Sequence, residues 1–151
     1  MVVWRICKSK YAASALDGTG AARTGNRWNE VGVKIAYTSG SLSLAALELL
    51  VHVDAVDAPD GLVAVSATLP KGTKVGVLKQ RLPADWRVMP APASTAALGS
   101  RWARRAKTLV LKVPSVIVPS EFNYLVNPLH PDFGAIVLGK PRSFTFDPRL
   151  F

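Results

Sequence analysis

The sequence has one cysteine, few acidic residues and no long apolar run. Because Cys7 is alone among the 151 residues, an internal disulfide and a zinc site built from cysteine ligands are excluded. A reducing, cytoplasmic environment is the simplest setting for such a chain, and we expect that localisation. No apolar stretch reaches bilayer-spanning length, and the N-terminal MVVWRICKSK lacks the apolar core and small-residue cleavage site of a signal peptide. We therefore expect no membrane partner and no secretion.

The scarcity of acidic residues makes the chain strongly basic. Nineteen Lys and Arg residues against ten Asp and Glu give a formal net charge of +9 and a sequence pI near 10.1. Such an excess favours nucleic acid, an anionic small molecule or an acidic protein as partner. One local cluster comprises Arg101, Arg104, Arg105 and Lys107. It is interpreted first as a solvated helix face and second as a docking or phosphate-binding face, and no recognised nucleic-acid motif accompanies it.

A hydrophobic content of 49% predicts a folded globular protein, and the length fits a single domain over residues 1–151. Short apolar, β-branched runs predict strands at residues 2–6, 34–38, 62–69, 74–78, 109–113, 116–118, 135–138 and 143–146. Helices are expected from a cap at Ser41 to about residue 52 and over residues 94–105, with a helical turn at 83–86. Residues 8–29 and 127–133 are expected to form loops. Because strands outnumber helices without alternating regularly, we predict an α+β fold with a compact, mixed and largely antiparallel sheet core.

Glycines at positions 18, 20 and 25 raise the question of a nucleotide-binding loop, and the sequence argues against one. A dinucleotide fingerprint needs glycine at the sixth position, where this chain has Arg23, and no helix pattern begins there. A P-loop would end in Gly-Lys-Ser or Gly-Lys-Thr, which this stretch lacks. The glycines instead predict a flexible loop that carries Arg23 and Arg27 over a site.

Arg27 and Tyr37 are the first two candidate site residues. The guanidinium of Arg27 is flanked by side-chain amides and an indole, and it offers a planar fork for phosphate or carboxylate. The alternative is an ordinary surface arginine that packs on Trp28. Tyr37 ends an apolar strand, where its ring is available to stack on a nicotinamide or another base, although a core-edge tyrosine explains it equally well.

Glu48 is the most informative residue of the chain. It lies in a helix that is apolar on nearly every face, and burying a carboxylate there is costly unless it is paired or hydrogen-bonded. Such positions are enriched in function, although structural ion pairs also occur. His52 follows one helical turn later on the same face, so we expect it to pair with Glu48 or to have a structural role at the helix end.

Two further segments carry polar groups that suit a ligand site. Pro114 interrupts a strand pattern next to Ser115, which makes that serine either a ligand-binding hydroxyl or part of a β-bulge. It lacks the G-x-S-x-G context of a nucleophile elbow. Asn127 opens the proline-stiffened loop NPLHPDF, in which His130 and Asp132 indicate a metal only weakly because two ligands do not complete a shell. We expect no metal.

Five ordered motifs resemble the RES-domain family over nearly the whole chain. They are GNRWN at 25–29, YTS at 37–39, the ALE helix at 46–48 with His52, VPS at 113–115 and NPLHPDF at 127–133. The C-terminal FTFDPRL is also similar to the end of family members. The arginine, glutamate and serine that give the family its name resemble Arg27, Glu48 and Ser115.

The resemblance implies the toxin of a bacterial toxin–antitoxin pair, with a fold similar to ADP-ribosyltransferase toxins. It implies consumption of NAD+ by hydrolysis, phosphorolysis or ADP-ribosyl transfer, with NAD+ as substrate, inorganic phosphate as one candidate co-substrate and no cofactor. The implied partner is an Xre-type helix-turn-helix antitoxin, beside a protein target if transfer is the reaction. Nucleic acid would be reached only through the antitoxin.

The same resemblance assigns roles to the candidate residues. Glu48 would stabilise the oxocarbenium-like state or orient the acceptor. Tyr37 would stack on nicotinamide, and Arg27 would hold the diphosphate. Ser115 would bind the carboxamide or ribose, with Asn127 and His52 as further substrate-binding candidates. The alternative function is a basic RNA- or DNA-binding module without enzymatic activity, which the charge and four tryptophans favour.

Overall fold

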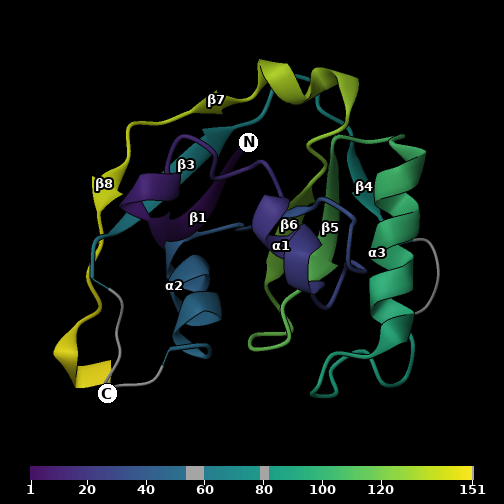
Figure 1. Ribbon diagram of the computed structural model, residues 1–151, viewed down its shortest axis with the longest axis horizontal. Helices are drawn as coiled ribbons and strands as arrows, with labels where there is room; N and C mark the ends of the chain where they lie inside the picture. Colours follow the sequence, from purple (N-terminus) through teal and green to yellow (C-terminus); the bar gives the residue numbers. More distant parts are fainter. Residues whose placement is uncertain (54–59, 79–81, 151) are drawn as a thin grey trace.

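A computed structural model describes residues 1–53, 60–78 and 82–150, which form a mixed α+β fold around one sheet (Figure 1). The strands are β1 (Val2–Lys8), β2 (Ala36–Ser39), β3 (Leu62–Thr68), β4 (Val75–Val77), β5 (Val110–Pro114), β6 (Phe122–Val126), β7 (Val137–Leu138) and β8 (Arg142–Ser143). The α-helices are α1 (Thr19–Thr24), α2 (Leu42–Leu50) and α3 (Ala93–Arg105). Short 3-10 helices span Ser9–Tyr11, Pro131–Ala135 and Pro148–Leu150. No helix within the described ranges is long and apolar enough to cross a membrane.

The strand order in the eight-stranded sheet is β4-β5-β6-β2-β1-β3-β7, and β8 pairs with β3 beside this path. The β4–β5 pairing is parallel, and the other pairings are antiparallel. Among the antiparallel neighbours, β5 and β6 are joined by the short segment 115–121, whereas β1 and β3, and β2 and β6, lie far apart in the sequence. The predicted α+β class with a largely antiparallel sheet is therefore confirmed.

The register places the polar candidates on one face of the sheet. Trp4 of β1 lies opposite Ser39 of β2, Ser39 lies opposite Asn123 of β6, and Asn123 lies opposite Val113 of β5. Directly paired residues point to the same face, so these four form one row across the sheet. Tyr37 begins the next row on this face. Helices α2 and α3 flank this region of the fold, with α1 between them (Figure 1).

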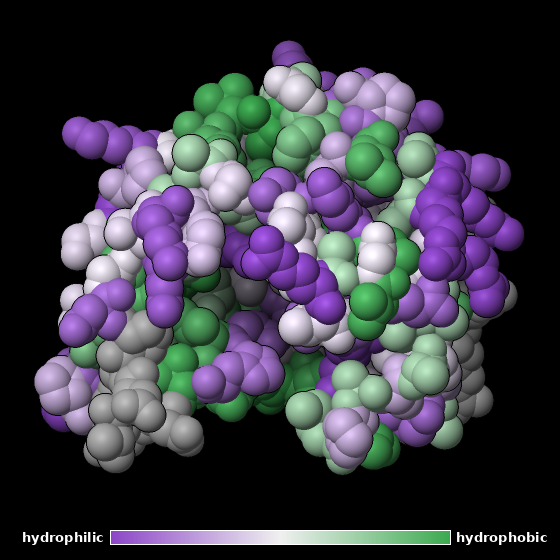
Figure 2. Space-filling model, in the orientation of Figure 1, coloured by the Kyte–Doolittle hydropathy of each residue, from purple (hydrophilic) through white to green (hydrophobic). Residues whose placement is uncertain are grey.

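The space between the flanking helices is open on its outer side. Figure 2, in the same orientation, shows the surface hollowed between the positions of α2 and α1, with hydrophilic side chains at the rim. On this face of the sheet, two clusters of apolar side chains lie on either side of the hollow. Trp28, Ile35, Leu111, Val113 and Leu125 pack together on the α3 side, and Ile6, Ala45, Leu62, Ala64 and Phe146 on the α2 side.

The opposite face of the sheet is closed by an apolar core. Buried residues there include Val3, Leu16, Ala36, Ala67, Leu69, Leu109, Val110 and Val126, with Phe133 and Ile136 packed against them. Side chains alternate between faces along a strand, so Arg5, next to Trp4 on β1, points to this closed side. Its Nη1 donates to the backbone carbonyl of Tyr37 at 3.0 Å. Arg5 thus ties β1 to β2 beyond Trp4–Ser39, the one residue pair that joins these strands in the sheet.

The principal predicted elements are confirmed. The hydroxyl of Ser41 accepts the backbone N–H of Leu44 at 3.1 Å, so the predicted cap begins α2. The helix predicted at residues 94–105 is α3, and the strands predicted at 2–6, 34–38, 62–69, 74–78 and 109–113 correspond to β1, β2, β3, β4 and β5.

Several local predictions were wrong. Residues 116–118 bend instead of forming a strand, because the Ser115 hydroxyl accepts the N–H groups of Ile117 and Val118 and removes them from any ladder. The loop predicted at residues 8–29 contains α1, whose first N–H is bound by Asp17. Strand β6 was not predicted. The strands expected at 135–138 and 143–146 are two-residue strands, and 83–86 overlaps a non-helical turn.

Candidate functional site

The carboxylate of Glu48 is held from one side by two side chains of the sheet. Its Oε1 accepts a hydrogen bond from the hydroxyl of Ser115 at 2.8 Å and another from Nδ2 of Asn123 at 2.5 Å. Within the described residues, no hydrogen bond reaches Oε2. The side chain of Glu48 is half-buried. One carboxylate oxygen is therefore anchored, and the other is available to a ligand.

Ser115 is fully buried and uses its hydroxyl completely. It donates to Glu48 and accepts the backbone N–H groups of Ile117 at 3.1 Å and Val118 at 3.0 Å. A hydroxyl has one donor and two acceptor positions, so none is left for a ligand in this arrangement. The sequence suggested a ligand-binding hydroxyl or a bulge, whereas the geometry makes Ser115 a support for Glu48.

Asn123 is a site residue that the sequence did not reveal. It lies on β6, and its Oδ1 accepts the hydroxyl of Ser39 at 2.7 Å while its Nδ2 donates to Glu48. Ser39 ends β2, directly opposite Asn123. The hydrogen bonds that hold Glu48 therefore continue from Asn123 on β6 to Ser39 on β2, the strand that also carries Tyr37. Recognising β6 as a strand would have placed Asn123 on the face of Tyr37, but no local signal links it to Glu48.

The hydroxyl of Tyr37 is built into the loop that carries Arg27. It donates to Oδ1 of Asn29 at 2.8 Å and accepts the backbone N–H of Trp28 at 3.0 Å. Asn29 is buried, and its Nδ2 donates to the carbonyls of Ala21, Glu30 and Val33. Burial raises the pKa of Tyr37 well above its ordinary value, with the N–H of Trp28 and the charge of Arg27 opposing this in part. The phenol therefore stays protonated, and the ring is held in place.

Arg27 reaches from its loop to the segment that precedes α3. Its guanidinium donates to the carbonyls of Trp86 at 2.5 Å and Val88 at 3.2 Å, and it contacts Sδ of Met89 at 2.8 Å. Burial lowers the pKa of Arg27 from its ordinary value, and the nearby carboxylate of Glu48 offsets part of that effect. Arg27 thus lies close enough to Glu48 and Tyr37 for their charges to affect its pKa.

Helix α3 fixes this loop from the far side. The backbone N–H of Glu30 donates to the hydroxyl of Ser100 at 2.9 Å, and the Glu30 carboxylate pairs with Arg104 at 2.9 Å. At Gly99 the helix approaches the loop so closely that a Cβ atom would lie 1.9 Å from the carbonyl oxygen of Trp28. The glycine is therefore required for α3 to pack against the Arg27 loop.

Two predicted site residues lie apart from this group. His52 is exposed in the turn after α2, and the described residues include no hydrogen bond or ion pair between it and Glu48. Asn127 is fully buried, with Nδ2 donating to the carbonyl of Ala103 and Oδ1 accepting the N–H of Leu129. It follows Asn123 by four residues, about 13 Å along an extended strand. The predicted ligand contacts of His52 and Asn127 gain no support from these positions.

The described residues also contain no group of three His, Cys, Asp or Glu side chains that is able to hold a metal ion. The site is instead one carboxylate with an unused oxygen, one guanidinium and one fixed aromatic ring. Such a set suits a ligand that combines an anionic group, hydroxyls and a planar ring.

Comparison with known proteins gives consistent matches over the whole chain. A family model described as the RES domain matches residues 2–147. The "Prs ADP-ribosylating toxin" of Sphingobium sp. (strain YBL2) is 39% identical over 160 residues, which cover 97% of this chain and 94% of that protein. "Toxin Res" of Yersinia enterocolitica is 38% identical over 151 residues, which cover 99% of each chain.

A solved structure has the same fold. It is a chain of the M. tuberculosis MbcT–MbcA toxin–antitoxin complex, which matches with a TM-score of 0.76 over 99% of this chain and 85% of that chain. The sequence identity is 18%, so this likeness establishes the fold and nothing finer.

Proposed function

The chain belongs to the RES-domain family, and from this membership we propose that it is the toxin of a bacterial toxin–antitoxin pair. We further propose that it is a cytoplasmic enzyme that cleaves the nicotinamide–ribose bond of NAD+. The relative from Sphingobium is named as an ADP-ribosylating toxin, which supports an enzymatic activity. The observation that carries the proposal is the carboxylate of Glu48, with one oxygen anchored and one unused.

Cleavage of this bond needs little besides charge stabilisation and positioning. The bonding electron pair leaves with nicotinamide, which becomes neutral, and positive charge develops on the ribose. A carboxylate fixed near that ribose stabilises the charge without reorganising during the reaction. The unused Oε2 of Glu48 supplies such a group, and Ser115 and Asn123 keep its orientation. Nicotinamide is already a good leaving group, so no cofactor or metal is invoked.

Arg27 and Tyr37 would bind the two ends of the reacting half of NAD+. The ring of Tyr37 is held by its hydroxyl and packs at the edge of the apolar cluster around Trp28 and Leu125, where it would stack on nicotinamide. Arg27 would hold the diphosphate. Its guanidinium currently donates to carbonyls of residues 86 and 88, and a diphosphate is a stronger acceptor than a neutral carbonyl. Binding would therefore exchange those contacts for ionic ones.

The acceptor of the ADP-ribosyl group is water, inorganic phosphate or a protein side chain. The three products differ in mass: ADP-ribose, ADP-ribose-1″-phosphate and a modified protein. Incubation with NAD+ in the presence and absence of phosphate and of candidate proteins, followed by mass spectrometry, separates the three reactions. In each of them nicotinamide is released.

The proposed partner is an Xre-type helix-turn-helix antitoxin. The net charge of +9 supports docking of an acidic protein surface, and it also attracts the anionic substrate. The related fold was solved as a toxin–antitoxin complex, which is consistent with a protein partner for this fold.

The proposal is tested by expression in a bacterial host without an antitoxin. Wild-type protein is expected to arrest growth and deplete intracellular NAD+, and Glu48→Gln is expected to do neither. Glu121→Gln is the matched control, because Glu121 is exposed and its hydrogen bonds to other described residues use only its backbone atoms. Growth arrest with intact NAD+ and no ADP-ribosylated protein would contradict the proposal. If that arrest were relieved by charge reversal at Arg101, Arg104 and Arg105, the alternative nucleic-acid-binding function would be favoured.

A further inference from the structure

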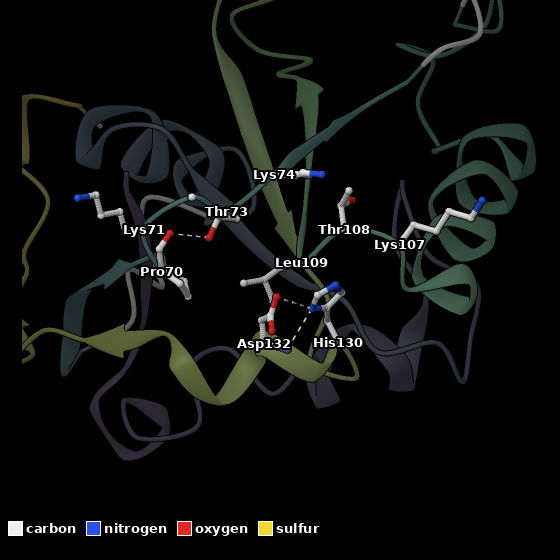
Figure 3. Close-up of a pocket in the computed structure, with 10 residues that line it drawn as sticks. Pro70, Lys71, Thr73, Lys74, Lys107, Thr108, Leu109, His130 and Asp132 are labelled. Atoms are coloured by element: carbon white, nitrogen blue, oxygen red, sulfur yellow. Dashed lines mark hydrogen bonds and ion pairs between the residues drawn. The ribbon is translucent and has the colours of Figure 1, made fainter.

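A pocket lies at the opposite end of the sheet from Glu48. It has a volume of ≈ 250 Å³ and is formed by three segments: the turn between β3 and β4, the junction of α3 with β5, and the start of the 3-10 helix at Pro131–Ala135 (Figure 3). Leu109 lines it, six residues before Ser115 along β5. Six extended residues span about 20 Å, so the pocket is separate from the carboxylate of Glu48.

The lining of this pocket is rich in positive charge. It includes Lys71, Lys74 and Lys107, and none of the three forms an ion pair with another described residue. In Figure 3, Lys71 and Lys107 flank the pocket, and their side chains extend outward in opposite directions. The lining carboxylate, Asp132, lies 3.8 Å from Nδ1 of His130. Three long, unpaired ammonium groups around one small cavity attract an anion.

Neutral side chains at the pocket add directed donors. The hydroxyl of Thr108 accepts the indole N–H of Trp102 at 2.9 Å, so its own proton remains free to donate. Nδ1 of His130 accepts the backbone N–H of Asp132 at 3.1 Å, which places the proton of the neutral ring on Nε2. The hydroxyl of Thr73 donates its hydrogen bond to the carbonyl of Pro70, so it is not counted as a donor to a ligand. The hydrogen-bond donors of the three lysines, Thr108 and His130 therefore outnumber the acceptors that the carboxylate of Asp132 offers.

We propose that this pocket is a binding site for a small phosphate-bearing molecule, with a diphosphate group as the part that it holds. Phosphate oxygens accept several hydrogen bonds at once, which matches the ammonium, hydroxyl and imidazole donors. The volume is smaller than the roughly 300–1,000 Å³ of pockets for drug-sized ligands, so a nucleoside attached to the diphosphate would extend into solvent. The site is independent of the proposed NAD+ chemistry at Glu48.

Isothermal titration calorimetry with inorganic pyrophosphate tests the site, with inorganic phosphate and ADP as parallel ligands. We expect pyrophosphate to bind more tightly than phosphate, and Lys74→Gln and Lys107→Gln each to weaken it about tenfold. Thr108→Val should weaken it without a change in net charge, and Thr108→Ser should restore it. Lys140→Gln removes one exposed positive charge outside the pocket and should change the affinity less than twofold. Tighter binding of ADP than of pyrophosphate would identify a nucleotide as the ligand.

Three results would overturn the proposal. The first is that wild-type protein shows no pyrophosphate binding at millimolar concentration. The second is that Lys140→Gln weakens binding as much as Lys74→Gln does, which would indicate diffuse charge attraction. The third is that Arg27→Gln abolishes binding, which would place the pyrophosphate at the candidate active site. Because the pocket variants leave Glu48 untouched, they should consume NAD+ at the wild-type rate, so failure of this proposal is distinguishable from failure of the proposed function.

Discussion

At the scale of single residues, the two oxygens of Glu48 are used differently. Ser115 and Asn123 bind Oε1, and neither binds Oε2. The side chain of Glu48 is half-buried, and Oε2 is not a buried atom without a partner, so solvent or a ligand can reach it. The fold therefore fixes the direction of the carboxylate through one oxygen and leaves the other for a ligand.

Ser115→Ala tests whether this anchoring matters. The variant removes one donor to Glu48 and leaves two backbone N–H groups without their acceptor. We expect a loss of about 1–3 kcal/mol in the free energy of unfolding and a lower kcat for nicotinamide release, with KM less affected. Ser43→Ala, at an exposed position of α2, is the control for both measurements. An unchanged kcat in folded Ser115→Ala protein would show that the anchor is dispensable.

Tyr37→Phe tests the hydroxyl that joins β2 to the Arg27 loop. Without it, Oδ1 of Asn29 and the N–H of Trp28 lose their partner. In urea unfolding, we expect the free energy of unfolding of Tyr37→Phe to be about 1–3 kcal/mol lower than that of wild type. Tyr11→Phe, at an exposed tyrosine, should leave the unfolding free energy unchanged.

Comparison of Tyr37→Phe with wild-type protein also tests the pH dependence of stability. Burial raises the pKa of Tyr37 above its ordinary value of 10.0, so the folded state holds the phenolic proton more tightly than the unfolded state. The resulting stabilisation is fully present below pH 10 and declines as the pH rises above it. Wild-type protein should therefore lose stability more steeply above pH 10 than Tyr37→Phe does. If the stability of wild-type protein and of Tyr37→Phe declined equally with pH, the raised pKa of Tyr37 would be contradicted.

At the scale of elements, the site depends on α3 as much as on α2. Helix α2 presents Glu48, whereas α3 contributes Gly99 and Ser100, which fix the loop of Arg27 and Trp28. The sequence showed that α3 exists and is basic on its outer side. It did not show which loop the helix packs against, since that is a contact between residues about 70 positions apart.

Gly99→Ala tests this packing. The added Cβ would meet the carbonyl oxygen of Trp28 at 1.9 Å, so the helix and the loop have to separate. Such overpacking typically costs about 1–3 kcal/mol, and we expect weaker NAD+ binding as the Arg27 loop shifts. Gly20→Ala in α1 is the matched control, because its Cβ would meet nothing within 4 Å. Unfolding of Gly99→Ala at the same urea concentration as wild type would contradict this close packing of α3 on the loop.

The elements that the sequence predicted are those with strong local signals. Ser41 and the apolar run after it define α2, and the β-branched residues of β3 define that strand. Residues 116–118 have an equally strong strand pattern, and the hydroxyl of Ser115 overrides it. Strand β6 escaped prediction because its five residues, FNYLV, lack clear alternation and stand beside loop-forming segments.

At the scale of the whole molecule, the order of the strands assembles the site. Strands β2 and β6 are far apart in sequence and adjacent in the sheet, which brings Ser39 to Asn123 and so to Glu48. Family resemblance predicted Arg27, Tyr37, Glu48 and Ser115 as a group. It did not predict Asn123, and it placed Asn127 in the group although that amide is used within the fold.

The sheet also separates two regions of different chemistry. The carboxylate of Glu48 lies at one end, and the basic pocket around Lys74 and Thr108 lies at the other. The net charge of +9 is thus partly concentrated where the proposed reaction does not take place. A phosphate-bearing ligand and NAD+ are therefore expected to bind at the same time without competing.

The central claim is that Glu48 is the carboxylate through which this protein cleaves NAD+. Its most direct test is nicotinamide release from NAD+ by purified wild-type protein and by Glu48→Gln, followed by mass spectrometry. Wild-type protein is predicted to release nicotinamide, and the variant to do so at least about 10²-fold more slowly while remaining folded. Intact NAD+ with wild-type protein under every acceptor condition, or equal rates for the two proteins, would contradict the claim.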